Sequence, residues 1–210
     1  MKKFFTIIPL QQPGQLTSGV YKAVDNQRLA MAEPARFPIL TAVNGYVEPG
    51  EQFYMIAIGG KSEAEQKNLA LLREEIDLLC ERRGIQCLGV EFVETSSDQR
   101  VAANISLFEK LIALTADHDE LHVCITYGKK TQPMAVLAAI RYAYRLKKNV
   151  SIKCIVYGNI DRETRDGKMV EVGRQVYDET AMAQLDEITR MLAERGIENP
   201  EEAIKMILSL

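Results

Sequence analysis

Residues 121–133 read LHVCITYGKKTQP, an apolar run followed by a short polar loop and a proline. The run from Leu121 to Thr126 predicts a buried strand, and Pro133 suits the first turn of a helix that continues to about Lys147. The apolar residues from Val150 to Tyr157 predict the next strand. A strand, a helix and a second strand in this order favour a parallel sheet with helical connections.

The same alternation extends toward the N-terminus. We predict strands over residues 3–10, 37–43, 53–58 and 86–93, and helices over residues 62–84 and 101–114. Ser62 is a suitable N-cap and Gly84 a suitable stop for the first helix, whose apolar stripe is Leu69, Leu72, Ile76 and Leu79. The apolar face of the second helix is Ile105, Phe108 and Ile112. The expected fold class is α/β and Rossmann-like, with a mostly parallel sheet, helices on both faces and a C-terminal helical tail.

The C-terminal third of the chain changes character. Residues 158–167 are charged and rich in turn formers, and residues 169–172 are predicted to return as a short strand. The pattern is helical from Asp178, and Asn199-Pro200 is a strong start for a last helix. We therefore expect a Rossmann-like domain over residues 1–173 and a helical tail over residues 174–210, which packs on the domain or on a dimer partner.

Composition excludes several classes of protein. The chain has 210 residues, 47% of them hydrophobic, and a net charge of -3, which argues against a generally basic nucleic-acid coat. No apolar run approaches the roughly 20 residues that cross a bilayer. Residues 4–10 follow two lysines as in a signal peptide, but Pro9 and Gln11 interrupt the run and no small-residue cleavage site follows. We expect a cytoplasmic protein that binds neither membranes nor duplex DNA.

The cysteines and histidines suggest no metal site. Cys80, Cys87, Cys124 and Cys154 form no CxxC pair, so reduced, structural thiols are expected, with no metal and no cofactor. His118 lies in an acidic run that predicts a solvated turn. His122 lies in the predicted strand at 121–126, where we expect an interior histidine whose ring nitrogens have partners.

Three loops follow predicted strands and are candidates for ligand contact, because ligands bind outside the carboxyl ends of parallel strands. The first contains Gln11 and Gln12. The second, Gly59-Gly60-Lys61-Ser62, ends like a Walker A loop, but Met55 stands where that motif needs its first glycine. It is either a glycine turn with a serine cap or an anion contact at a helix N-terminus. The third, residues 126–132, is either a phosphate-binding loop or a solvated turn.

Together these segments resemble a known family. The strand, the run Thr126-Tyr127-Gly128-Lys129-Lys130-Thr131, the long helix and the strand ending in Tyr157-Gly158 resemble the CRISPR-associated DxTHG-motif proteins. Those proteins belong to the CARF (CRISPR-associated Rossmann fold) group, sensors of cyclic oligoadenylates in type III systems. Thr126 and Gly128 match the motif, whereas Cys124 stands in place of its Asp and Tyr127 in place of its His.

The resemblance implies a two-fold homodimer in which the carboxyl-end loops of both copies contact one cyclic oligoadenylate. Lys129, Lys130 and Thr131 would then contact phosphate, with Gly128 allowing close backbone approach. The flanks, which read adenine or ribose, would be Gln11, Gln12, Gly60, Lys61 and Ser62.

Two activities fit a stand-alone sensor domain of this group. One is a metal-independent ring nuclease, in which a ribose 2'-hydroxyl attacks the adjacent phosphate; the groups assigned to it are Lys129, Lys130, Thr126 and Tyr127. The other is a non-catalytic module that signals to a partner through the helical tail. A Rossmann-like enzyme acting on an ordinary nucleotide is a third, less favoured class, because no GxGxxG follows the first strand.

Overall fold

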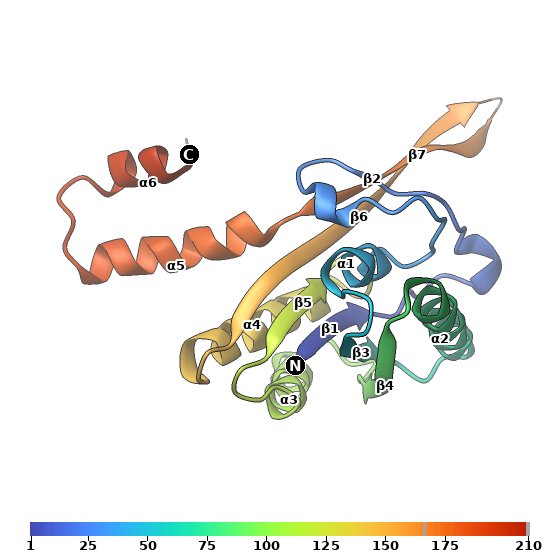
Figure 1. The fold of residues 1–210 in the computed structure, drawn as a ribbon, viewed down its shortest axis with the longest axis horizontal. Coiled ribbons are helices and arrows are strands. Elements are labelled where there is room, and N and C mark those ends of the chain that lie inside the picture. The colour runs from blue at the N-terminus through green and yellow to red at the C-terminus, as the bar shows by residue number, and fades with distance from the viewer. Residues whose placement is uncertain (166, 209–210) are drawn as a thin grey trace. The chain divides into compact units, whose positions relative to one another are not determined.

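One sheet organises the computed structural model, which describes residues 1–165 and 167–208 (Figure 1). Within the described residues the sheet has seven strands in the order β2-β7-β6-β5-β1-β3-β4. Neighbouring strands are parallel except for the antiparallel pair of β6 and β7. The bounds are β1 Lys2–Ile7, β2 Lys22–Ala23, β3 Gln52–Gly59, β4 Gln86–Glu94, β5 Glu120–Cys124, β6 Ser151–Arg165 and β7 Lys168–Asp178. The predicted α/β, mostly parallel, Rossmann-like fold is confirmed.

Helices connect the parallel strands and cover both faces of the sheet (Figure 1). The pair α1 and α2 pack together, and so do α3 and α4. Right-handed crossovers place the pairs on opposite faces, because β1, β3 and β4 progress in one direction across the sheet and the chain then returns to β5 and β6. The bounds are α1 Ile39–Tyr46, α2 Glu63–Arg83, α3 Val101–Ala113 and α4 Thr131–Leu146. No described helix is both long and apolar enough to cross a membrane.

The capping signals of α2 act as predicted. The Ser62 side chain accepts a hydrogen bond from the backbone N–H of Glu65, and Gly84 ends the helix with φ +63°. The predicted apolar stripe is the buried face, with Leu72 fully buried. Local sequence therefore determines both ends and the orientation of this helix.

The predicted strand at residues 37–43 and the predicted buried face of α3 are wrong. Residues 37–43 were expected as a strand, but α1 begins at Ile39, and all residues from Ile39 to Val43 are buried. A short run that is apolar on every side has no periodicity to separate a strand from a buried helix. In α3 the buried residues are Leu107 and Leu111, whereas Ile105 is 52% exposed.

The strands β6 and β7 form a hairpin arm. Residues 158–165 continue β6 rather than forming a turn-rich excursion, and β7 is longer than the predicted strand at 169–172. Asp166 lies outside the described residues. Gly173, the expected domain boundary, is inside β7, and the first compact unit extends to Asp178.

The second compact unit covers residues 179–210, of which 209 and 210 are outside the described residues. It contains α5 Thr180–Glu194 and α6 Pro200–Leu208. The helical character and the start of α6 at Pro200 agree with the sequence prediction.

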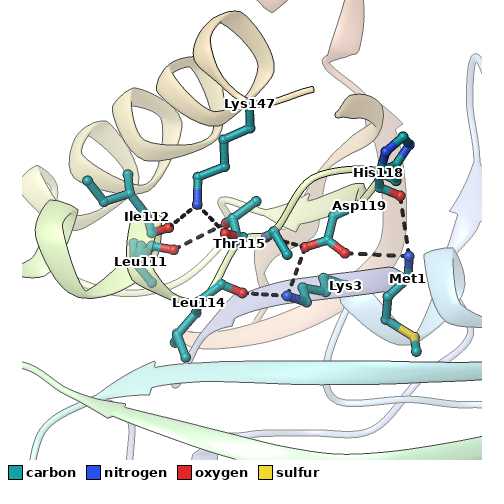
Figure 2. A network of polar contacts seen from close by, with 10 residues as sticks. Met1, Lys3, Leu111, Ile112, Leu114, Thr115, His118, Asp119 and Lys147 are labelled. Atoms are coloured by element: carbon teal, nitrogen blue, oxygen red, sulfur yellow. Dashed lines mark hydrogen bonds and ion pairs between the residues drawn. The ribbon is translucent and has the colours of Figure 1, made fainter. Parts of the chain in front are cut away.

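Two lysine side chains contact the C-terminus of α3, near the amino end of β1 (Figure 2). Lys3 Nζ lies 2.8 Å from a carboxylate oxygen of Asp119 and donates to the carbonyl of Leu114 at 2.6 Å. Lys147 Nζ donates to the carbonyl of Ile112 at 2.7 Å. Because the last carbonyls of a helix lack partners within it, these ammonium groups complete the end of α3.

Candidate ligand-binding site

The loops after β1 and β5 leave the sheet at its topological switch point. The chain proceeds from β1 to β3 and β4 on one side, and from β5 to β6 on the other. Connections therefore diverge at the carboxyl ends of β1 and β5, where open α/β sheets bind ligands. The loop after β1 contains Gln11 and Gln12, and the loop after β5 contains residues 125–130.

Gly128 brings the β5–α4 loop against the end of β1. It has φ +97°, and a Cβ atom placed on it would lie 2.5 Å from Ile7 Cγ2 and 2.6 Å from Gln132 Oε1. Any other residue would be strained in the left-handed region and would collide with β1. The loop backbone is therefore folded tightly over the end of β1.

Lys129, Lys130 and Thr131 lie together where this loop enters α4. Lys130 is exposed and immediately precedes the helix, and Thr131 is its first residue. The Oγ1 atom of Thr131 is buried and has no hydrogen-bond partner among the described residues. A helix N-terminus with adjacent lysines favours an anion.

The hydroxyl groups of Thr126 and Tyr127, two of the groups assigned to catalysis, make hydrogen bonds within the fold. Thr126 Oγ1 accepts the backbone N–H of Gly158 at 2.8 Å and contacts Cys124 Sγ at 3.1 Å. The Tyr127 hydroxyl donates to the carbonyl of Arg36 at 2.8 Å, and its side chain is buried. Burial raises the pKa of Tyr127 above its ordinary value. These hydroxyls connect structural elements and do not line an exposed loop surface.

The carboxylate of Glu65 binds to the loop Gly59-Gly60-Lys61-Ser62 from within the protein. One carboxylate oxygen of Glu65 accepts the N–H of Gly60 at 2.6 Å, and the other accepts the Ser62 hydroxyl at 2.6 Å. Lys61 Nζ lies 2.7 Å from a carboxylate oxygen of Glu94. This is the capping arrangement of a glycine turn with a serine cap, and the groups that an external anion would use already have a carboxylate partner.

Gln11 and Gln12 are exposed and are positioned by a residue that the sequence analysis missed. Asn68, fully buried in α2, donates from Nδ2 to the carbonyls of Pro9 at 2.9 Å and Gln11 at 2.8 Å. The signal was present, because Asn68 is a polar residue on the apolar face of a helix. Such a residue needs hydrogen-bond partners when buried.

Gln132 is the second residue that was missed. Its buried side chain accepts the backbone N–H of Lys129 at 2.7 Å and donates from Nε2 to Thr95 Oγ1 at 3.0 Å. Thr95 belongs to the β4–α3 loop, residues 95–100. The side-chain amide of Gln132 therefore links the loop after β5 to the loop after β4. No local sequence pattern reveals this contact.

His118 is exposed and His122 is buried, as predicted, but one expectation about His122 is wrong. His118 is in an exposed turn with φ +66°, whereas His122 is fully buried and stacks on Phe4 with ring centroids 4.3 Å apart. Both ring nitrogens of His122 lack hydrogen-bond partners among the described residues, so the expectation of partnered nitrogens is wrong. Burial, with nearby Lys2, lowers the pKa of His122 to about 3.

The four cysteines are free thiols, as predicted. Cys124 and Cys154 are buried, and burial raises the pKa of both thiols. In the part of the chain that the structure describes, no group of three or more His, Cys, Asp or Glu side chains is placed to hold a metal ion.

No protein-family model and no curated protein matches this chain. The fold and the loop geometry define a Rossmann-like α/β protein with a candidate anion site at the switch point.

Proposed function

We propose that this protein binds cyclic oligoadenylate at the carboxyl ends of β1 and β5, as a CARF-type sensor of type III CRISPR defence. The observation that carries the proposal is the β5–α4 loop, where Gly128 brings the backbone over Ile7 and into the N-terminus of α4. Lys129 and Lys130 precede the helix and Thr131 begins it, so a phosphate at that point meets positive charge and the helix dipole together.

A two-fold dimer would present two such loops to one symmetric ring. Support for a dimer comes from apolar side chains that α3 and α4 leave exposed: Val101 is 74% and Met134 is 70% exposed. The two helices are adjacent, with the rings of Phe108 and Tyr142 at 5.6 Å between centroids. We infer that a second copy covers this surface, because apolar side chains exposed together on adjacent helices are typical of an interface.

Binding is favoured over cleavage by the environment of the hydroxyl groups. Thr126 and Tyr127 hold Gly158 and Arg36, so two of the four residues assigned to catalysis already have structural partners. Lys129 and Lys130 remain as cations for a phosphate. The favoured role is therefore a cytoplasmic sensor module that needs no metal or other cofactor, with residues 179–210 as the segment that signals to a partner.

The test is incubation of the purified chain with cyclic tri-, tetra- and hexa-adenylate in EDTA, with ATP as the mononucleotide comparison. Calorimetry measures binding, and mass spectrometry detects products. We expect tight binding of one ring size at one ring per two chains, without cleavage. Linear products with a 2',3'-cyclic phosphate would instead establish a ring nuclease. Binding of ATP alone, or of nothing, would contradict the proposal.

A double variant locates the site. Lys129→Ala with Lys130→Ala should weaken ring binding at least about 100-fold, because two charge-assisted contacts to phosphate are lost. Lys67→Ala with Lys205→Ala removes the same charge from two exposed positions elsewhere and is the matched control. Equal affinity in the two double variants would refute the assigned site.

A further inference from the structure

Lys129 joins the predicted ligand loop to the β4–α3 loop. Its ammonium group donates to the backbone carbonyl of Ser97 at 2.8 Å and reaches that of Ser96 at 3.4 Å. The ammonium group that would contact phosphate is therefore hydrogen-bonded to backbone carbonyls in the unliganded protein. It spans from the carboxyl end of β5 to a loop that follows the edge strand β4.

The start of the β4–α3 loop is fixed independently of Lys129. Thr95 donates its backbone N–H to the carbonyl of Gly59 at 2.8 Å, and its hydroxyl accepts from Gln132. Beyond Thr95 the other described contacts of the loop backbone are local: Asp98 N–H donates to Ser96 Oγ at 3.0 Å, and Arg100 N–H to Asp98 Oδ1 at 2.9 Å. Among the described contacts, the one from Lys129 connects residues 96–97 to the neighbouring loop.

We propose that Lys129 is a ligand-operated latch, which holds the β4–α3 loop when the site is empty and releases it when a phosphate takes the ammonium group. The inference rests on the proposed function, since it assigns the regulation of that same site. A phosphate oxygen is an ionised acceptor, so its contact with the ammonium group adds a charge–charge attraction that a neutral carbonyl does not supply. Phosphate therefore displaces Ser96 and Ser97 from Lys129.

Release of the loop acts on the surface that we assign to the second copy. The β4–α3 loop leads directly into α3, and the Asn104 side chain donates to the carbonyl of Gln99 at 3.2 Å. The first turns of α3 carry the exposed Val101 and Ile105. A ligand at the switch point thereby changes how the N-terminus of α3 is held, while Gln132 keeps Thr95 in place as the fixed end.

The experiment is hydrogen–deuterium exchange with sub-second labelling on the full chain, following peptides that cover residues 95–100. Lys129→Met removes the latch, and Lys130→Met removes the same charge from the next residue, whose side chain is exposed. Without ligand, Lys129→Met should accelerate exchange in this segment about fivefold, the equivalent of one lost hydrogen bond, and Lys130→Met should leave it unchanged. Saturating cyclic oligoadenylate should accelerate exchange in the unmodified protein by a similar factor.

The outcomes separate the latch from the proposed function. Unaltered exchange in unliganded Lys129→Met overturns the latch. Calorimetric binding of a ring that leaves exchange in residues 95–100 unchanged or slower also overturns it, while the binding function stands. If no ring binds to the unmodified protein, the proposed function fails together with ligand-driven release, and the two unliganded variants still show whether Lys129 fastens the loop.

Discussion

Thr126 Oγ1 accepts the backbone N–H of Gly158 at 2.8 Å and thereby joins the residues after β5 to the middle of β6. Thr126 lies in the run with the strongest resemblance to a ligand-binding motif, and sequence reasoning assigned it to catalysis. Its contact belongs to the scaffold, because Gly158 lies where β6 leaves its pairing with β5 and its N–H would otherwise lack this acceptor. The same threonine can match a functional motif and serve the fold.

Thr126→Val should lower the free energy of unfolding by about 1–2 kcal/mol, because the N–H of Gly158 is left without its acceptor. Thr126→Ser keeps the hydroxyl and should stay within about 0.5 kcal/mol of the unmodified protein. Urea unfolding followed by circular dichroism measures both. Equal stability of the two variants would show that the hydrogen bond contributes nothing.

Tyr127→Phe should cost about 1 kcal/mol, because the carbonyl of Arg36 loses its donor. Since burial raises the pKa of Tyr127, its ionisation opposes folding. The stability that depends on the neutral phenol is complete below about pH 10 and is lost as the pH rises past that value. We expect a shallower alkaline loss of stability in Tyr127→Phe, measured by thermal unfolding from pH 8 to about 11. A steeper loss would contradict the assignment.

Glu65→Ala should destabilise the protein by about 1–2 kcal/mol, because the N–H of Gly60 and the hydroxyl of Ser62 lose their acceptor at the start of α2. Glu63→Ala removes an exposed acid from the same first turn and should destabilise the protein much less than Glu65→Ala. The comparison separates capping from general helix charge. Chemical denaturation of the two variants side by side provides the measurement.

His122 should make the protein sensitive to acid. Its pKa is about 3 in the fold against about 6.5 in an unfolded chain, so the unfolded state binds a proton first. The stability that the neutral ring provides is complete above about pH 6.5 and falls toward pH 3, by about 3 kcal/mol at pH 4.

His122→Phe should remove much of that dependence and retain folding at pH 7, because neither ring nitrogen has a described partner to lose. His118→Asn is the control, since asparagine tolerates the left-handed backbone of this exposed turn, and it should keep the acid sensitivity. Unfolding curves between pH 4 and 7 compare the variants. Identical slopes for both would assign the acid sensitivity to other groups.

Asp119→Asn should cost about 3 kcal/mol, because it leaves Lys3 without its buried carboxylate (Figure 2). Asp117→Asn is the matched control: this exposed carboxylate accepts only the N–H of Lys148 among the contacts described, at 3.0 Å. Thermal unfolding should place Asp119→Asn well below the control. Similar melting temperatures would mean that the buried pair does not stabilise this edge of the sheet.

Much of the fold was predictable because its signals are local. The N-cap Ser62, the C-terminal Gly84 and the stripe ending at Leu79 define α2 from sequence alone. The failures occur where burial removes periodicity, as at Ile39–Val43, and where pairing between two strands decides the structure, as in the β6–β7 arm. The charged residues of that arm suggest a turn until the partner strand is known.

The candidate site divides in the same way. Its position after β5, and the closeness of Gly128, Lys129 and Lys130 to a helix N-terminus, follow from the order of strand, loop and helix along the chain. The hydrogen-bond partners of the loop residues do not follow from that order. Asn68, which contacts the carbonyl of Gln11, and Ser97, which accepts from Lys129, come from other segments, and a single hydrogen bond over such a separation leaves no periodic pattern.

The sequence by itself therefore determined the class of fold, the ends of its regular helices and the position of the candidate loop at a helix N-terminus, since each depends on neighbours within a few turns or one strand. Only the tertiary structure decided which polar groups remain for a ligand. The hydroxyl groups of Thr126 and Tyr127 are hydrogen-bonded within the fold, whereas Lys130 and Thr131 lie at the N-terminus of α4. The reason is that a buried hydroxyl or carboxylate takes whichever partner the packed chain brings within 3 Å, and packing joins residues that the sequence keeps far apart.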